Sequence, residues 1–501
     1  MLKACSKLKK RITRTPEGIP TFFLSSTITS LVLPLTAIFN IFLSLGFVPS
    51  QWKSALIIPV FKKGNRRNVG NYRPISLTSS ICRLFEEVLL LKLISYTLEK
   101  NLLSKFQFGF IPNRTSCSNM LSSIHSWLLN YSNSDCTTVL YTDIKKAFDS
   151  VNHRFLIQIL HSLGFNLEVI AWISAFLSDR QQQVCINNCI SSPLSVLSGV
   201  PQGSVIGPFI FLVYFDKITD ITNSFPNVNI RLFADDSKLF SRHPQDLQEA
   251  INNSDDWLSQ HQLALAPEKC AVLKIKKTTV QENANFSLKG HPITEVSNFK
   301  DLGIIVSSNL EWSTHIDSIF HKASVTTYQI TKSFKSRNIW TWLKIFNTYI
   351  RPKVEFNTQI WSPHLKKDIK KIEFIQRRFT KFAFDKCSIP YTSYEDRLRQ
   401  IGYLTLKQRR TYFDLILMYK TINNISDLQF EDYFYLTTSN YFLRSHSLQI
   451  KTKENFNCPK LTHSFFGRTP SLWNALPEKL VESSSLNVFK FKLKAHLLKF
   501  P

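Results

Sequence analysis

Two groups of carboxylates stand out in this chain because their neighbours are apolar. Asp143 ends the run TTVLYTD (137–143), and Asp235 and Asp236 lie inside NIRLFADDSKLF (229–240). The first run predicts a buried strand, and the second predicts two short strands with the adjacent aspartates at the turn between them. Two neighbouring carboxylates among Phe and Leu repel each other and are costly to bury unless a cation neutralises them.

Hard oxygen ligands at the ends of strands suit Mg²⁺. This ion binds few carboxylates and completes its octahedron with water and phosphate oxygens. Two such ions can stabilise an in-line displacement at phosphorus. A solvated Asp-Asp turn is the alternative interpretation, and the carboxylates alone do not decide between the two.

Several elements are expected to position these groups. Residues 51–78 predict a strand, a basic loop and an extended segment, and residues 81–103 predict an amphipathic helix. Helical patterns also cover 145–162, 167–178 and 246–262. Beyond about residue 310 the chain becomes helical, aromatic and basic.

The composition limits the class of protein. The 501 residues are 44% hydrophobic, and 62 Lys+Arg against 36 Asp+Glu give a formal charge of +26. This excludes a disordered tail, a collagen-like fibre and an acidic binding protein, and it favours a polyanionic partner such as nucleic acid. The nine cysteines form no CxxC motif, which indicates reduced thiols rather than a disulfide framework or a zinc site.

The N-terminal region contains no charged residue from Gly18 to Trp52. Its length would allow a membrane span, but polar residues and Pro34 interrupt it. We therefore expect a buried helix here, and no membrane partner.

Seven sequence blocks occur in a fixed order. YTDIKKAFDSVNH (141–153), SGVPQGSVIGP (198–208) and LFADD (232–236) strongly resemble three successive active-site blocks of reverse transcriptases. NYRPISLTS (71–79) and FQFGFIPNRTS (106–116) are similar to the fingers blocks of that family. LALAPEKCAVLKI (263–275) and FKDLGIIV (299–306) are similar to the two blocks that follow the active site. The detailed sequence of these blocks is similar to that of the jockey-like group of LINE-type, non-long-terminal-repeat retrotransposons. The tail, with SLWNALP (471–477), resembles these elements too.

The resemblance implies an α+β fold, the right-hand polymerase. The expected parts are an N-terminal segment with fingers (1–135), a palm with an antiparallel sheet (136–306), a helical thumb (307–385) and a mainly helical, basic C-terminal domain (386–501). The implied activity is that of a nucleotidyltransferase, an RNA-directed DNA polymerase. It would extend a primer 3′-hydroxyl with dNTPs on an RNA template by two-metal phosphoryl transfer.

The same resemblance implies roles for individual residues. Asp143, Asp235 and Asp236 would hold two Mg²⁺ ions, with Mn²⁺ as a substitute, and Lys269 would protonate the leaving pyrophosphate. Phe148 would exclude a ribose 2′-hydroxyl from the nucleotide site. The other nucleotide-binding candidates are Gln202, Arg73 and Arg114. The alternatives are a surface lysine at Lys269, a core ring at Phe148 and an ordinary turn at Gln202.

Further residues are expected to contact nucleic acid. Gly303 would form the tight turn that grips the primer. Cations in the loop after the first strand and on the helix predicted at 366–381 would face the phosphate backbone: Lys62, Lys63, Lys370, Arg377 and Arg378. Solvated charge explains these cations equally well. The family often has a basic residue where this chain has Ile111, so the second fingers block is imperfect.

The implied partners are an RNA template, a DNA primer or target, and dNTPs, while the oligomeric state stays open. The expected location is intracellular, in cytoplasm and nucleus. We expect no endonuclease domain upstream of this polymerase. One alternative is a truncated, catalytically inactive relic that only binds nucleic acid, and another is a host-adopted or intron-type reverse transcriptase. An RNA-copying RNA polymerase is disfavoured by Phe148.

Overall fold

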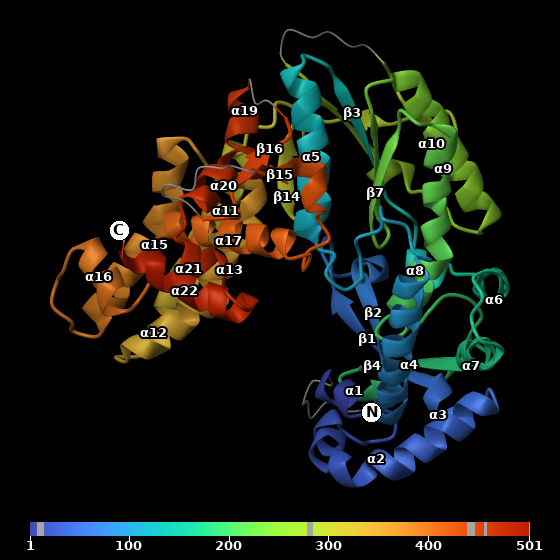
Figure 1. Cartoon of the computed structure of the whole chain (residues 1–501). Coiled ribbons are helices and arrows are strands. Elements are labelled where there is room, and N and C mark those ends of the chain that lie inside the picture. The colour runs from blue at the N-terminus through green and yellow to red at the C-terminus, as the bar shows by residue number, and fades with distance from the viewer. Residues whose placement is uncertain (8–14, 278–283, 438–445, 455–457, 500–501) are drawn as a thin grey trace.

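A five-stranded sheet carries the predicted carboxylates at one end and organises the middle of the chain (Figure 1). In this computed structural model, which describes residues 1–7, 15–277, 284–437, 446–454 and 458–499, the strand order is β12-β9-β3-β8-β7. The bounds are β3 (Thr137–Thr142), β7 (Asn229–Phe233), β8 (Asp236–Ser241), β9 (Ala271–Ile275) and β12 (Thr294–Glu295). Only the β12–β9 pair among these is parallel. The predicted strand at 137–143 and the predicted hairpin are confirmed.

Both faces of this sheet are buried, because successive residues of a strand point to opposite sides. Leu140 and Leu239 belong to the apolar core formed with the N-terminal half of the chain. Val139, Tyr141 and Phe240 belong to a second core, formed with the helices that follow residue 310. The sheet therefore joins two hydrophobic cores.

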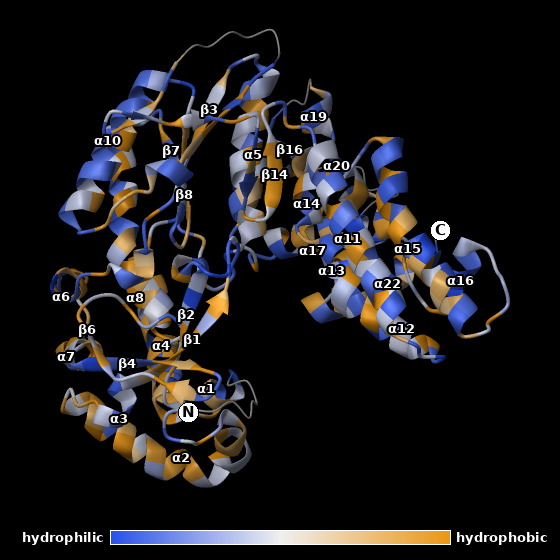
Figure 2. Ribbon diagram, turned by 180° about the vertical axis from the view of Figure 1, so that it is seen from behind, coloured by the Kyte–Doolittle hydropathy of each residue, from blue (hydrophilic) through white to orange (hydrophobic). Residues whose placement is uncertain are grey.

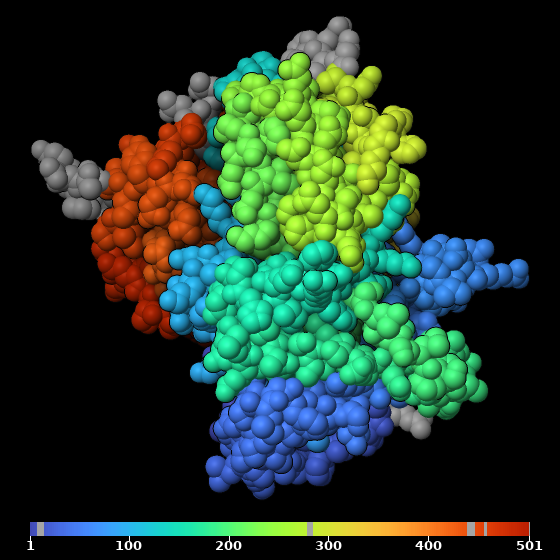
Figure 3. Space-filling model, turned by 90° about the vertical axis from the view of Figure 1, so that its right-hand side faces the viewer, coloured from blue at the N-terminus to red at the C-terminus, as the bar shows by residue number. Residues whose placement is uncertain are grey.

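The predicted fingers form a second sheet. Its strands are β1 (Ser54–Phe61), β2 (Tyr72–Leu77), β4 (Arg180–Ile186), β5 (Cys189–Ile190) and β6 (Leu194–Val196), in the order β2-β1-β4-β5 with β6 also on β4. β1 and β2 form an antiparallel pair, and the basic loop joins them. In Figure 3 this loop, in mid-blue, projects from the body of the molecule. α4 (Ser80–Glu99), the predicted amphipathic helix, follows β2.

The helices around the palm sheet include one correction. The pattern at 145–162 predicts one helix, but the structure has a short 3-10 turn, η2 (Ala147–Asp149), and then α6 (His153–Ser162). The interruption follows Lys146, which has a positive φ of 46°, and Asn152 caps α6 by accepting a hydrogen bond from the Phe155 amide. The remaining elements are α5 (Ser116–Ser132), α7 (Leu167–Leu177), α8 (Gly207–Phe215), η3 (Asp216–Asp220), α9 (Ile221–Ser224), α10 (Pro244–Gln260) and η4 (Pro267–Lys269).

The predicted thumb and C-terminal domain are mainly helical and pack together beside α5 (Figure 1). The thumb comprises α11 (Ser313–Ser333), α12 (Ile339–Ile345), η5 (Phe346–Ile350), α13 (Arg351–Glu355), α14 (Thr358–Trp361) and α15 (Lys366–Lys386). The C-terminal helices are α16 (Tyr394–Gln400), α17 (Leu406–Ile422), α18 (Phe430–Tyr433), α19 (Pro459–Thr462), α20 (Phe465–Asn474), α21 (Glu478–Val481) and α22 (Leu486–Lys499). Three small antiparallel pairs complete the fold: β10 (Ser287–Leu288) with β11 (His291–Pro292), β13 (Asn298–Asp301) with β14 (Ile304–Ser307), and β15 (Phe434–Leu436) with β16 (Ile450–Thr452).

The N-terminal helices correct a second prediction. α1 (Leu2–Lys7), α2 (Thr21–Ser44) and α3 (Ser50–Lys53) lie at the lower end of the molecule. The expectation of a buried helix is wrong: α2 buries only Leu24, Ile28 and Phe39, while Leu33 is 81% exposed. The helix touches α1, α4 and α7 along a narrow stripe, and the rest of its apolar surface faces outward (Figure 2). Within the described residues α2 alone is long and apolar enough to cross a membrane, a criterion of length and composition that core helices also meet.

Acidification is expected to lower the free energy of unfolding, because two buried histidines resist protonation. Burial lowers the pKa of His125, in α5, to about 4 and that of His315, in α11, to about 4. An imidazole in an unfolded chain has a pKa of about 6.5. The stability that depends on the neutral rings is therefore fully present above about pH 6.5 and is lost as the pH falls toward 4. Urea unfolding between about pH 7.5 and 5 measures this dependence.

His315→Gln should reduce the pH dependence, because it removes one of the two rings. His321→Gln is the matched control, since this ring is exposed on the same helix. If His315→Gln left the pH dependence equal to that of His321→Gln, the buried imidazole would not be its source.

Candidate active site

The predicted carboxylates meet at one end of the palm sheet. Phe233 pairs with Asp236 across the β7–β8 hairpin, so Ala234 and Asp235 form the turn. Asp143 follows the last residue of β3, the strand next to β8. Asp236 lies at the start of β8 rather than inside the turn, and its side chain is exposed at the strand end.

The turn holds a strained backbone that one buried amide stabilises. Ala234 has a positive φ of 58°, which is unfavourable for a residue with a Cβ. Oε1 of Gln107 accepts hydrogen bonds from the amides of Ala234 (2.9 Å) and Gly109 (2.8 Å), and its Nε2 donates to the Ala234 carbonyl (3.3 Å). A Cβ on Gly109 would lie 2.3 Å from the Ala234 nitrogen, so only glycine fits there. The sequence pattern predicted no role for Gln107, although its position within the apolar block FQFGF (106–110) was an available signal.

The carboxylates are close enough to perturb one another. Burial and the charge of Asp143 raise the pKa of Asp235. Partial burial of the Asp236 carboxyl raises its pKa to about 6, and the negative charges of Asp235, Asp301 and Asp143 act in the same direction. A cation between these groups would remove the repulsion.

A lysine already neutralises one of the three. Nζ of Lys269, in η4, lies 2.6 Å from Oδ2 of Asp143, and this hydrogen bond raises the pKa of Lys269. As the side chains stand, no three acidic, His or Cys residues within the described ranges are grouped closely enough to hold a metal ion. The donor set nevertheless fits a hard divalent cation, because three mutually repelling carboxylates meet at solvent-accessible strand ends. Asp143 would first have to exchange its lysine for the ion.

Cations of the fingers face this cluster. Lys62 and Arg73 both act to lower the pKa of Asp235, so they lie within electrostatic reach of it. Arg73 pairs with Val60 across the β1–β2 hairpin, and the Lys62 amide donates to the Asn71 carbonyl. Lys63 is exposed in the same loop. The placement is suitable for binding the phosphates of a nucleotide, a role that stays a prediction.

Phe148 is joined to the loop 198–206, because its carbonyl accepts a hydrogen bond from the Val200 amide at 2.8 Å. Its ring is partly buried and stacks on Phe211, with ring centres 4.7 Å apart. Gln202 donates from Nε2 to Oδ1 of Asp149 at 2.8 Å, and its carbonyl accepts from the Ser76 amide of the fingers.

Glycine allows the close approach of this loop to its neighbours. Gly199 has a φ of 82°, and a Cβ there would lie 2.6 Å from the Asp149 backbone. Glu86, on α4, is fully buried and accepts hydrogen bonds from the amides of Val205 (2.7 Å) and Ile206 (3.0 Å). A glutamate among the apolar residues of the predicted helix was a signal for this contact that the sequence analysis did not use.

Two further predicted residues, Arg114 and Gly303, lie in turns of the backbone. The Arg114 guanidinium donates to the carbonyls of Ser104 and Gln107, which ties the turn before α5 together. Gly303 occupies the turn of the β13–β14 hairpin, where Leu302 and Gly303 have φ values of 44° and 91°. Positive φ at both central residues is typical of a tight two-residue hairpin turn.

The predicted basic residues of α15 are exposed. Lys370, Arg377 and Arg378 all face solvent, while Ile372, Ile375 and Phe379 are buried on the other side of the helix. Arg377 lies over the Tyr394 ring, and Arg378 borders a small cavity beside Tyr328 and Phe374. The helix is amphipathic as predicted, and its contact with nucleic acid stays a prediction.

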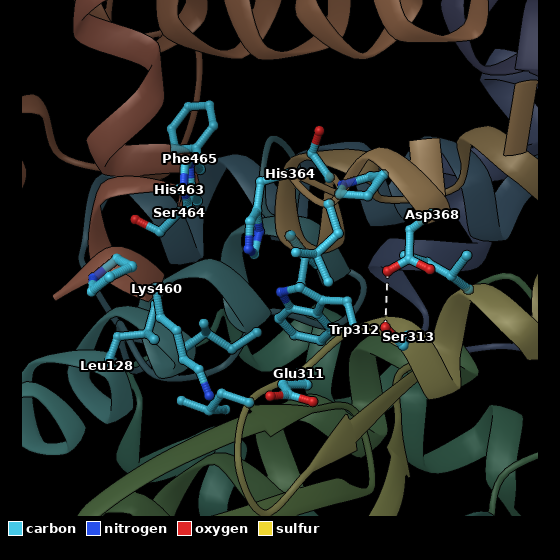
Figure 4. Close-up of a pocket in the computed structure, with 18 of the residues that line it drawn as sticks. Leu128, Glu311, Trp312, Ser313, His364, Asp368, Lys460, His463, Ser464 and Phe465 are labelled. Carbon is cyan, nitrogen blue, oxygen red and sulfur yellow. Dashed lines mark hydrogen bonds between the residues drawn. The ribbon is translucent and has the colours of Figure 1, made fainter. Parts of the chain in front are cut away.

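Two cavities lie near the junction of palm and thumb. One, of about 110 Å³, is lined by Asp143, Asp236, Lys269 and the β13–β14 hairpin. The other, of about 210 Å³, lies between α5, the thumb and the C-terminal domain, and shares no lining residue with the first. In it the rings of His364 and His463 stack 4.2 Å apart, and Ser313 donates to Asp368 (Figure 4).

Comparison with known protein families matches residues 60–306 to the family described as "Reverse transcriptase (RNA-dependent DNA polymerase)". This range begins in β1 and ends in β14. It contains the three aspartates, the loop 198–206 and the β13–β14 hairpin.

Several curated proteins of Drosophila melanogaster are similar over most of this chain. The RNA-directed DNA polymerase from mobile element jockey is 27% identical over 360 residues, which cover 69% of this chain and 39% of that protein. The probable RNA-directed DNA polymerases from transposon X-element and transposon BS are 25% and 26% identical, over 70% and 71% of this chain and 40% and 41% of their own lengths. The chain thus spans about two fifths of the length of these relatives.

Solved structures give a weaker likeness. Apo telomerase from Candida tropicalis aligns with a TM-score of 0.43 and 11% identity, over 76% of this chain and 67% of that chain. The telomerase of Candida albicans in complex with a fragment of telomeric RNA aligns with a TM-score of 0.37 and 12% identity, over 71% of this chain and 62% of that chain.

Gln107→Leu is expected to destabilise the protein by about 1–3 kcal/mol, since it leaves buried amide groups of Ala234 and Gly109 without partners. Urea unfolding at neutral pH measures the change. Gln260→Leu is the matched control, because Gln260 is exposed at the end of α10. A loss below about 0.5 kcal/mol, the range of ordinary surface substitutions, would contradict the assigned role of Gln107.

Proposed function

We propose that residues 60–306 form a reverse transcriptase domain of the jockey-like, non-long-terminal-repeat type, and that the chain synthesises DNA on an RNA template for a retrotransposon. The reaction joins the 3′-hydroxyl of a primer to the α-phosphate of a dNTP and releases pyrophosphate. The proposed partners are the RNA template, a DNA primer or target and dNTPs. Synthesis at chromosomal DNA would take place in the nucleus, after RNA binding in the cytoplasm.

One observation carries this proposal. Asp143 and the turn that bears Asp235 and Asp236 lie at the same end of neighbouring strands, with Lys62 and Arg73 of the fingers within electrostatic reach. Carboxylates on one side and cations on the other are what a triphosphate with its metal ions requires. The positive charge of the whole chain, +26, favours the binding of a nucleic acid backbone.

The family generally depends on divalent metal ions. For this chain we propose two Mg²⁺ ions, replaceable by Mn²⁺, held by Asp143, Asp235 and Asp236. The ions would activate the primer hydroxyl and neutralise charge on the phosphates. The residues around them have separate tasks: Gln107 holds the turn in place, and Glu86 holds the loop that carries Gln202.

Lys269 is proposed to act in two ways. Its ammonium group pairs with Asp143 and so balances the negative charge of this carboxylate. With a metal ion held by Asp143, the ammonium group of Lys269 would be free to donate a proton to the leaving pyrophosphate. The proton is then replaced from solvent, because the Lys269 side chain is 55% exposed.

Wild-type protein is expected to incorporate dTTP on poly(rA)/oligo(dT) with Mg²⁺, and Asp235→Asn to lower the rate by at least about 100-fold, because it removes charge where the metal and phosphates meet. Asp256→Asn, at an exposed site on α10, is the matched control and should extend primers at the wild-type rate. Primer extension resolved on gels, with binding of primer–template measured separately, gives both quantities.

Binding without extension by the wild-type protein would overturn the proposal and favour an inactive relic that only binds nucleic acid. Extension by Asp235→Asn at the control rate would show that the assigned carboxylates do not perform the chemistry.

Phe148→Val should raise the ratio of UTP to dTTP incorporation by at least about tenfold, because it removes the ring expected to collide with a 2′-hydroxyl. Phe491→Val, at a side chain 77% exposed on α22, is the control. If the Phe148→Val protein still extends with dTTP but its ratio of UTP to dTTP incorporation is unchanged, the ring does not select the sugar and only packs against Phe211.

A further inference from the structure

The hairpin β13–β14 packs against the palm sheet beside the carboxylates, with which it lines one cavity. In β3, Tyr141 lies two residues before Asp143, and in β8, Lys238 lies two residues after Asp236. Residues two apart on a strand share a face of the sheet. Tyr141 and Lys238 are also direct partners across the two strands, so they form a platform on the face that bears the carboxylates.

Two residues of β13 meet this platform. The Phe299 ring stacks on Tyr141, with ring centres 3.8 Å apart and planes at 13°. Oδ2 of Asp301 lies 2.6 Å from Nζ of Lys238, and these side chains are 8% and 4% exposed. Phe299 and Asp301 are themselves two apart, so each platform residue has one partner on the hairpin.

Side chains of α5 confine the ammonium group of Lys238 on the side away from Asp301. Lys238 lies 3.3 Å from Sδ of Met120 and near the ring of Trp127, so its ammonium group is enclosed by α5 on the other side. Replacing a buried ion pair by apolar side chains of similar size is often neutral or stabilising, so stability alone does not explain this pair. Immediately after Asp301 the chain enters the turn of Leu302 and Gly303.

We propose that the Lys238–Asp301 pair is a positioning device. It fixes the distance between the β13–β14 turn and the metal-binding carboxylates, and thereby the position of the primer terminus. This inference rests on the proposed function. Neither residue touches substrate: Asp301 acts through the turn, and Lys238 acts through Asp301. The cavity between the hairpin and Asp143, Asp236 and Lys269 is the space whose shape the pair controls.

The test separates positioning from stability. The double variant Lys238→Met/Asp301→Leu replaces the pair by apolar side chains. Its stability in urea should equal or exceed that of the wild type, while the distance between hairpin and sheet is no longer fixed by an ion pair. We expect kcat for primer extension to fall at least about tenfold, because a displaced reacting group reacts slowly, with the KM for dTTP changed less than about threefold. Asp301→Glu is the second variant: it keeps both charges but adds one methylene between hairpin and sheet, and it should also lower kcat.

The matched control is Asp255→Asn. It removes a carboxylate that is likewise paired with a lysine, Lys289, but on α10 and away from the carboxylate cluster. Its kcat should equal that of the wild type. A wild-type kcat in either pair variant, in folded protein, would overturn the proposal.

A second readout keeps this result apart from the proposed activity. A primer with 2-aminopurine as its 3′-terminal base reports the environment of that base by fluorescence, without any catalysis. We expect the wild type and Asp255→Asn to give one signal and both pair variants to give another. If the wild type binds primer–template but does not extend the primer, the proposed function fails. The fluorescence still tests the role of the Lys238–Asp301 pair, because equal signals from all four proteins would overturn that role.

Discussion

Alternation of side chains along two short strands is the constraint on which the rest of this structure depends. In β3 and β8 the even spacing of residues sends Val139, Tyr141 and Phe240 to one core and Leu140 and Leu239 to the other. Asp143 and Asp236 continue the first of these series beyond the apolar part of each strand. The carboxylates therefore emerge toward the side on which the β13–β14 hairpin and the thumb are built, and a shift of either strand by one residue would turn them away.

The charge at this point is balanced locally, although the chain as a whole is strongly basic. Each aspartate has a cation within reach: Lys269 for Asp143, Lys62 and Arg73 for Asp235, and Lys238 for Asp236. These cations come from parts of the chain far apart in sequence, so the cluster is neutralised only when the fingers and separate segments of the palm have come together. The fold and the electrostatics of the site are thus completed in the same step.

The sequence predicted those features that depend on local patterns. The strand before Asp143, the hairpin at Asp235 and the amphipathic helix after Lys366 each follow from spacing within a few residues. Gln107 could not be recognised in this way, because its role arises from a turn 127 residues later. Lys238 has the spacing of an ordinary solvent-facing residue in a strand, and only the packing of α5 and β13 buries it. The prediction that α2 is buried failed for the opposite reason. Its composition is apolar, but composition does not determine how much of the surface of a helix is covered by other elements.

The two cores on either side of the palm sheet have a consequence for how this chain can be divided. The family match ends at residue 306, yet the apolar face of β3, β8 and β9 is covered by α5 and by helices from beyond that point. A fragment ending at the match boundary would carry every predicted catalytic group but would expose a broad hydrophobic surface, and it would aggregate rather than fold. The folding unit of this protein is therefore larger than the matched range: helices of the C-terminal region share a core with the palm sheet, although they are distant in sequence from the predicted catalytic groups.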